Sequence, residues 1–280
     1  MRNLLILLVV LVSMCMDSTA QQASVILENP SNTDLFIRAE AIPSVVRSGR
    51  NLDMIFDLTN KRQEKLKNVS FLAYDQCLFS GDNIKFFDDI QPNQTERWSW
   101  KWLTVETNFE RDCTIKFNVE YSSEFSRTQS VAVLSQVEYN QREAAGTLSS
   151  VPLSSSSTQN AINIIISFSE TQPFVEGDSI TMFIDYVNEE TGIIDQLNPE
   201  EVSMTLPRNI GNIACNEYDL QNDKLILNRS LKFIGGRAPR SSCTFKAILS
   251  GASPIDTDAI TLTAMYKYLI DNSLTVKVRP

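Results

Sequence analysis

Apolar and polar residues alternate along much of this chain, which is the pattern of half-buried β-strands. The clearest example is segment 49–60 (GRNLDMIFDLTN), where every second residue from Leu52 to Leu58 is apolar. Side chains two residues apart lie on the same face of a strand, so this segment predicts a strand with one face in a core. No segment shows the period of a long helix. The pattern therefore predicts an all-β protein.

Segment 177–188 (GDSITMFIDYVN) repeats this pattern. Its glycine and asparagine are separated as Gly49 and Asn60 are, and its apolar residues fall at the matching positions. A proline precedes the segment in each copy, Pro43 in the first and Pro173 in the second. Agreement at this many positions indicates an internal duplication.

Later segments of the two copies match more loosely. Residues 68–70 (NVS) correspond to residues 201–203 (EVS) at the start of the next predicted strand. Near the end of each copy, segments 114–133 and 260–278 contain two alternating apolar runs around a short polar stretch, which predicts a β-hairpin in each. A copy with several short strands and no long helix is typical of a β-sandwich.

Composition separates the two copies. Residues 146–160 (GTLSSVPLSSSSTQN) are rich in serine and threonine and have too little apolar surface to form a core, so we expect a flexible linker there. Residues 135–145 before it suggest one short helix. We predict a first sandwich domain at 21–134, a helix and linker at 135–160, and a second sandwich domain at 161–280.

The first twenty residues predict a signal peptide. Arg2 supplies the positive charge, the apolar core extends from Leu4 to Met16, and small residues precede the expected cleavage after Ala20. No later apolar run is long enough to span a bilayer. We therefore expect a mature chain that is exported and has no membrane span.

Two other interpretations of this segment are less well supported. An uncleaved N-terminal anchor would need about 20 apolar residues, and the core is shorter than that. Lipid attachment at Cys15 would need a small residue before it, where Met14 stands.

Four cysteines remain after removal of the signal: Cys77, Cys113, Cys215 and Cys243. An even number in an exported chain indicates disulfides, and one pair falls within each predicted domain. We expect Cys77 to pair with Cys113 and Cys215 with Cys243. Aligning the two final segments on their tyrosines does not superpose Cys113 on Cys243, so the second bridge can join a different pair of strands. Zinc is disfavoured because no two of these cysteines lie two to four residues apart.

The charge and the missing histidine exclude several function classes. A formal net charge of −9 and a pI of about 4.7 disfavour nucleic acid and anionic lipid as partners. The chain contains no histidine, the commonest general base and zinc ligand, and no Ser-x-x-Lys motif. We expect no enzymatic activity, no cofactor and no metal site. A pair of carboxylates for glycoside hydrolysis is the alternative that a sequence leaves open.

Three tryptophans, Trp98, Trp100 and Trp102, alternate in the segment RWSWKWL and so share one face of a predicted strand. An exposed row of rings would offer flat apolar faces on which sugars stack. A buried row would form the core side of a sandwich strand. We expect burial, with glycan stacking as the alternative.

Other polar motifs fit the surface of an exported protein. The candidate acceptors for N-glycosylation are Asn68, Asn93 and Asn228, of which Asn93 lies in a predicted turn. Acidic pairs are candidates for calcium, but no Asp-x-Asp-x-Asp-Gly loop is present, so we expect a solvated surface. These pairs are Asp88-Asp89, Glu189-Glu190 and Glu200-Glu201.

Both copies resemble the Ig-like modules of the CARDB-like (cell-adhesion-related) and archaeal S-layer-associated type. The resemblance rests on the proline before the turn glycine, the alternating strand that ends in asparagine, the Val-Ser strand, the turn at 92–95 (PNQT) and the final tyrosine-containing segment. It covers nearly all of the mature chain, although the cysteine pairs and Lys61, where a glycine is expected, depart from it. It implies two tandem Ig-like β-sandwich domains in an extracellular, surface-associated protein without catalytic residues.

We therefore expect a non-enzymatic extracellular or cell-envelope protein with a structural or adhesion role. Its expected partner is a cell-surface protein or glycan, or a second copy of the chain. One alternative is an accessory subunit of a surface filament or transport assembly, docked by addition of a strand to an open sheet edge. Another is a carbohydrate-binding module, which depends on the tryptophan row.

Overall fold

The computed structural model describes residues 24–28, 35–62, 64–158 and 160–280, so the predicted signal peptide lies outside the described residues. Strands dominate, which confirms the all-β class. Within these ranges the one α-helix is α2 (Gln136–Ala144), in the segment where a short helix is predicted. No helix in the described part of the chain is both long and apolar enough to span a bilayer.

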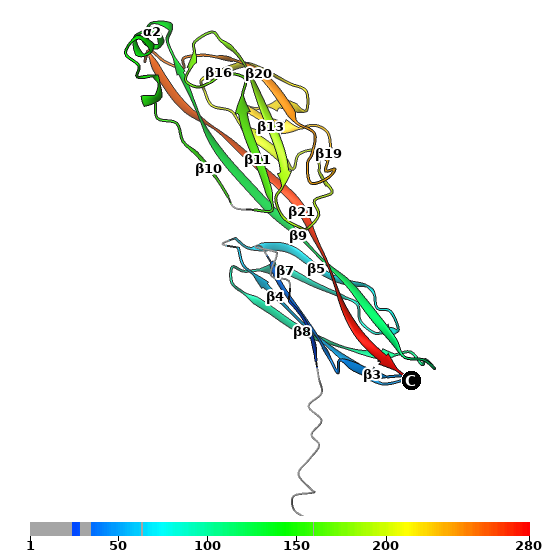
Figure 1. The fold of residues 1–280 in the computed structure, drawn as a ribbon. Helices are drawn as coiled ribbons and strands as arrows, with labels where there is room; N and C mark the ends of the chain where they lie inside the picture. The colour runs from blue at the N-terminus through cyan, green and yellow to red at the C-terminus, as the bar shows by residue number, and fades with distance from the viewer. Residues whose placement is uncertain (1–23, 29–34, 63, 159) are drawn as a thin grey trace, which may run out of the picture.

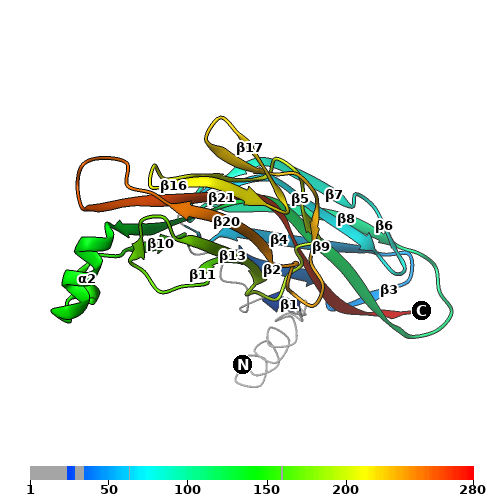
Figure 2. The ribbon, with the colours of Figure 1, turned by 90° about the horizontal axis from the view of Figure 1, so that it is seen from above.

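Two long strands run through the whole molecule (Figure 1). β9 (Arg111–Leu134) has 24 residues and β21 (Ile255–Arg279) has 25. They pair antiparallel from Leu134 opposite Ile255 to Arg111 opposite Val278, and we call them the central strand pair. At about 3.3 Å per residue this pair is on the order of 80 Å long. Helix α2 lies at one of its ends and the C-terminus at the other (Figures 1 and 2).

The central strand pair corrects the predicted hairpins at 114–133 and 260–278. Each segment forms part of a single strand and pairs with the segment from the other copy. The polar stretch in the first segment does not interrupt the alternation, because Tyr121, Ser123 and Phe125 are all buried and point to the same side. A strand can therefore continue where local pattern suggests a turn.

The N-terminal half has two sheets packed face to face. Phe56 of the first sheet contacts Phe71 and Phe117 of the second, with ring centroids 4.6 and 5.7 Å apart. The first sheet consists, in order, of β1 (Val25–Glu28), β2 (Leu35–Ile42), β4 (Asn51–Asn60), β8 (Thr95–Thr104) and β6 (Phe79–Ser80). The second adds β3 (Val45–Arg47), β5 (Leu66–Asp75) and β7 (Ile84–Ile90) to the central strand pair.

The C-terminal half has the same layout. Its separate sheet consists, in order, of β11 (Ile162–Phe168), β13 (Ser179–Asn188), β20 (Ser241–Ala247) and β16 (Ile210–Cys215). Here the central strand pair is extended by β10 (Ser155–Ser157), β12 (Phe174–Val175), β15 (Val202–Thr205), β17 (Tyr218–Gln221) and β18 (Lys224–Leu227). A small separate sheet is formed by β14 (Gln196–Leu197) and β19 (Leu231–Lys232).

Each half is completed by a strand from the other copy. In the N-terminal half, β9 pairs with β5, and β21 lies between β9 and β3. In the C-terminal half the roles are exchanged: β21 pairs with β15, and β9 lies between β21 and β12. Buried apolar side chains form one continuous cluster through both halves. The predicted boundaries follow the duplication in the sequence, whereas in space neither half is one continuous segment.

The serine-rich segment lies along the central strand pair. Ser155–Ser157 pair with residues 127–129 of β9 through backbone hydrogen bonds, which need no apolar side chains. Val151 is buried with Ala132 and Leu134. A short 3₁₀ helix, η1 (Leu148–Ser150), connects this segment to α2. Within the segment expected to be a flexible linker, Ser155–Ser157 therefore form a strand that pairs with β9.

The two matching segments of the duplication form equivalent strands, β4 and β13, with equivalent turns. Gly49 and Gly177 precede these strands with φ of +70° and +94°, a backbone conformation that glycine adopts without a steric penalty. After the strands, Asn60 Nδ2 donates to the carbonyl of Glu64 (2.7 Å) and Asn188 Nδ2 to the carbonyl of Gly192 (2.7 Å). The asparagine at the end of each segment thus closes the following turn.

Candidate functional site

The tryptophan row forms part of the core of the N-terminal half. Trp102 is fully buried, Trp100 is 8 % exposed, and Trp98 is half-buried. Trp98 stacks on Phe56 with ring centroids 5.2 Å apart, and Trp102 Nε1 donates to the carbonyl of Asp82 (2.6 Å). Trp100 and Trp102 therefore belong to the core, whereas Trp98 keeps part of its surface exposed.

The structure pairs the cysteines within each half, as predicted. Cys77 bonds to Cys113 with Cα atoms 5.6 Å apart, and Cys215 bonds to Cys243 with Cα atoms 4.1 Å apart. The first bridge links the turn after β5 to the start of β9 in the central strand pair. The second links the neighbouring strands β16 and β20. The two bridges therefore join different strands, which explains why Cys113 and Cys243 do not superpose.

The three glycosylation candidates all lie at the surface. Asn93 is exposed in the turn between β7 and β8, with φ of +59°. Asn68 is exposed at an irregular point in β5, with φ of +51°. Asn228 is also exposed, but its Nδ2 donates to Asp219 Oδ1 (2.9 Å). Attachment of a glycan at Asn93 or Asn68 would disturb no side-chain hydrogen bond described in the structure.

The acidic pairs are spread over separate elements. One pair ends β7, a second follows β13, and a third precedes β15. Asp89 forms an ion pair with Lys65 (2.8 Å), and Glu201 accepts a hydrogen bond from the backbone of Asn198 (2.8 Å). Among the residues that the structure describes, no group of three or more carboxylate or cysteine side chains could hold a metal ion.

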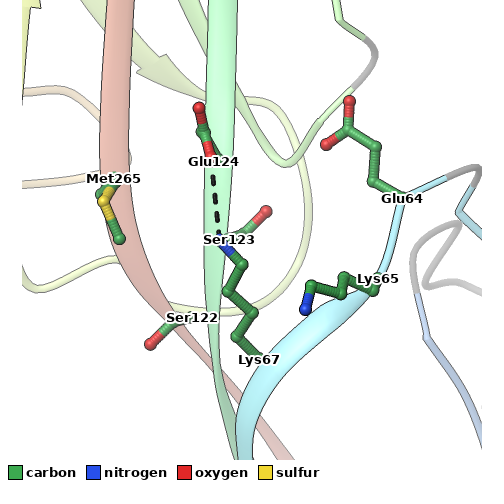
Figure 3. Close-up of a pocket in the computed structure, with 7 residues that line it drawn as sticks. All are labelled: Glu64, Lys65, Lys67, Ser122, Ser123, Glu124 and Met265. Atoms are coloured by element: carbon green, nitrogen blue, oxygen red, sulfur yellow. Dashed lines mark ion pairs between the residues drawn. The ribbon is translucent and has the colours of Figure 1, made fainter. Parts of the chain in front are cut away.

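A pocket of about 280 Å³ lies where the two halves meet, and we call it the junction pocket (Figure 3). Its walls come from the turn after β4, the start of β5, the middle of β9 and the facing part of β21. The residues that line it are Glu64, Lys65, Lys67, Ser122, Ser123, Glu124 and Met265.

The charges of the junction pocket are paired. Lys67 Nζ lies 3.9 Å from Glu124 Oε2 (Figure 3). Lys65 forms the ion pair with Asp89 described above. Behind the wall, the buried guanidinium of Arg62 donates to Ser123 Oγ and lies 3.7 Å from the carboxylate of Glu64. Paired charges and hydroxyl groups suit hydrogen bonding to a small polar group.

The junction pocket is not predictable from the sequence pattern, because its walls come from segments that are far apart in the chain. The available signal was residues 122–124 (SSE), polar residues inside an otherwise alternating segment. That signal predicts a turn or a strand interruption as readily as a pocket wall. The meeting of this stretch with the turn after Asn60 is a property of the tertiary structure.

Comparisons with known proteins identify no family. No family model and no curated protein matches the sequence, so the CARDB-like resemblance is not confirmed. Solved structures that match include a protein of unknown function from Porphyromonas gingivalis W83, with 11% identity and a TM-score of 0.20. That match covers 80% of this chain and 83% of the other.

Two further structures match in part. One is the C-terminal globular domain of an oligosaccharyltransferase from Pyrococcus abyssi, with 8% identity, a TM-score of 0.24, and coverage of 92% of this chain and 49% of that one. The other is the secreted serine protease VesC from Vibrio cholerae, with 9% identity, a TM-score of 0.20, and coverage of 88% and 51%. The chain spans about half the length of these two structures. Similarities at this level carry no argument about function.

Proposed function

We propose that this chain is a non-enzymatic extracellular protein of the cell surface or envelope, with a structural or adhesion role. The central strand pair is the observation that carries this proposal. It joins both halves into one elongated body, and each half contains one disulfide. An elongated body stabilised by disulfides suits a structural protein whose two ends are held far apart. Disulfides persist in oxidising compartments, which supports export.

The strand order supports two Ig-like modules. In an immunoglobulin fold, strands C, F and G share one sheet, while A, B, E and D form the other. The N-terminal half has the order β5-β9-β21 in its shared sheet, and the C-terminal half has β15-β21-β9. These triplets correspond to C-F-G in each half. Under this assignment the G strand of each module is supplied by the other copy.

The proposal is tested on intact cells that express the chain. Surface labelling followed by crosslinking is expected to mark the protein and to join it to an envelope component. The matched control lacks residues 1–20 and is expected to stay unlabelled. Wild-type protein that is found inside the cell, or that neither labels nor sediments with the envelope, would contradict the surface role.

A second candidate is an accessory subunit of a larger surface assembly. The observation that favours it is the open edge of the sheet at β7, which offers a place for strand addition. Purification from native membranes with a partner in fixed stoichiometry would favour this candidate over a free-standing adhesin. The packing of the tryptophan rings gives the carbohydrate-binding alternative no comparable support.

A further inference from the structure

Two of the three candidate acceptors for N-glycosylation lie at the same end of one pair of strands. β5 and β7 are neighbours in the large sheet (Figure 1), and Lys67 of β5 pairs with Asp89 of β7. Asn68 follows Lys67, at the irregular point of β5. Asn93 lies in the turn that comes directly after β7. The two acceptors therefore belong to one small region of the N-terminal half.

Both side chains in this region are free to carry a sugar. Asn68 and Asn93 are exposed, with φ of +51° and +59°, and no side-chain hydrogen bond of either is described in the structure. The turn at Asn93 is held by its backbone N–H, which donates to the carbonyl of Asn60 (2.9 Å). Asn228 differs, because its Nδ2 already donates to Asp219 Oδ1 (2.9 Å). A glycan therefore fits the first two sites without the loss of a contact.

The exchange of strands keeps Asn68 and Asn93 unfolded for longer than Asn228. An oligosaccharide is transferred to an unfolded segment while the growing chain is exported. The N-terminal half cannot complete its second sheet before β21 is made, because β21 lies between β9 and β3. β21 begins 162 residues after Asn93 but only 27 residues after Asn228. At a synthesis rate of about 5–20 residues per second, these intervals last roughly 8–32 s and roughly 1–5 s.

We propose that Asn68 and Asn93 carry N-linked oligosaccharides in the exported protein, and that Asn228 stays unmodified in most molecules. The donor is a sugar linked to a lipid pyrophosphate in the exporting cell. A bond forms between Nδ2 and the anomeric carbon of the first sugar, and the bond from that carbon to the phosphate oxygen breaks. The lipid pyrophosphate leaves as an anion, and one amide proton passes to solvent. This proposal rests on export, which is part of the proposed function.

Site occupancy in secreted wild-type protein tests the proposal. The protein is expressed in cultured animal cells, which N-glycosylate exported chains, and is then treated with peptide-N-glycosidase in water enriched in heavy oxygen. This treatment converts each modified asparagine into a labelled aspartate, which mass spectrometry detects. We expect the label at Asn68 and Asn93 in most molecules. Because transfer competes with folding, the occupancy at Asn93 should exceed that at Asn228 by about fivefold, following the ratio of the two intervals.

Variants of the acceptor motifs assign the glycans to their sites. Asn68→Gln and Asn93→Gln should each remove one step in gel mobility, and the double variant should run as the deglycosylated chain does. Thr95→Ala keeps Asn93 but removes the hydroxyl that the motif requires, so the glycan should be lost, whereas Thr95→Ser should retain it. Asn228→Gln is the matched control and should run as wild type does.

The possible failures of this proposal and of the surface role can be told apart. Secreted protein with all three asparagines unmodified would overturn the proposal and leave the surface role standing. Equal occupancy at the three sites would overturn the distinction between Asn228 and the other two. A chain that stays in the cytosol would contradict export, and both proposals with it. Because occupancy is measured on wild-type protein, these results do not depend on the folding of any variant.

Discussion

The two halves of the molecule use the same asparagine turn with different results. In the C-terminal half, Gly192 donates its backbone N–H to the hydroxyl of Tyr268 (2.7 Å), and a Cβ at this glycine would lie 2.5 Å from the tyrosine ring. In the N-terminal half, the equivalent residue after Asn60 is Glu64, whose side chain lines the junction pocket. At the fourth position after the asparagine, a glycine lies against the central strand pair in one half, and a glutamate lines a pocket beside that pair in the other.

The disulfides also differ in whether they reach the central strand pair. Cys77–Cys113 attaches the N-terminal half directly to β9 of the central strand pair. Cys215–Cys243 lies within the separate sheet of the C-terminal half. The continuous core nevertheless connects both halves, so we expect them to unfold together. The first two predictions test this dependence of each half on the other.

The largest effect is expected from deletion of residues 270–280. This deletion removes the part of β21 that pairs with β3 and with the first residues of β9, so the N-terminal half loses an inner strand. We expect that half to lose its cooperative fold. Because all three tryptophans lie in β8 of this half, their emission should shift to the red and become accessible to acrylamide. Deletion of Pro280 alone is the control. Native emission from the longer deletion would show that the N-terminal half does not need β21.

Removal of either disulfide is expected to have the next largest effect. The bridges span 36 and 28 residues, and loops of this size contribute roughly 3–4 kcal/mol on the chain-entropy model. The double variants Cys77→Ser/Cys113→Ser and Cys215→Ser/Cys243→Ser should therefore lose similar amounts of stability in urea. Tryptophan emission reports on the N-terminal half. Because the two halves are expected to unfold together, each double variant should still show a single transition, shifted to lower urea. A transition that responds to the first variant but ignores the second would show that the halves unfold separately.

The contrast between the turns can be tested with one matched pair of alanine variants. Gly192→Ala forces a methyl group into the ring of Tyr268, and overpacking of this kind costs about 1–3 kcal/mol. Glu64→Ala creates no clash but removes the ion pair with the buried Arg62, so it should cost about 1 kcal/mol or less, below the cost of Gly192→Ala. Urea unfolding measures both values. Equal costs at the two positions would contradict the different packing of the two turns.

Local pattern predicted the strands of the duplication well. The alternation in segments 49–60 and 177–188 corresponds to β4 and β13, and the position of the cysteines in the two copies predicted both bridges. The strands depend on the pattern of neighbouring residues, and the disulfides depend on the separation of the cysteines along the chain. The tryptophan row was ambiguous at this level, since a one-sided row fits both a core and an exposed surface.

The exchange of strands could not be predicted in the same way. A polar stretch at residues 122–124 is compatible with a hairpin turn and with a continuous strand, and the choice depends on which strand lies opposite. Pairing of β9 with β21 brings together residues more than a hundred positions apart, such as Tyr121 and Tyr268. The junction pocket depends on that pairing, because residues of both β9 and β21 line it, so it too was beyond the reach of local pattern.

A tyrosine pair provides the last and smallest contrast between the halves. Tyr186 of β13 occupies the strand position that Leu58 holds in β4, and its hydroxyl bonds to that of Tyr218. Burial raises the pKa of Tyr186 to about 12 and also raises the pKa of Tyr218. A raised pKa in the folded state means that the unfolded chain loses its proton first. The stability that this tyrosine contributes is therefore complete below pH 10 and is lost as the pH rises toward 12.

Urea unfolding at pH 9 and pH 11 measures this loss. Between these two values, ionisation of Tyr186 in the unfolded chain should lower the stability of wild-type protein by about 1 kcal/mol. Tyr186→Phe removes the ionising group, so this variant should lose correspondingly less over the same interval, although it starts from a lower stability because the hydroxyl of Tyr218 loses its partner. Leu58→Ile is the matched control in the other half and should retain the wild-type dependence on pH. An equal loss in wild type and Tyr186→Phe would mean that Tyr186 ionises as readily in the folded protein as in the unfolded chain.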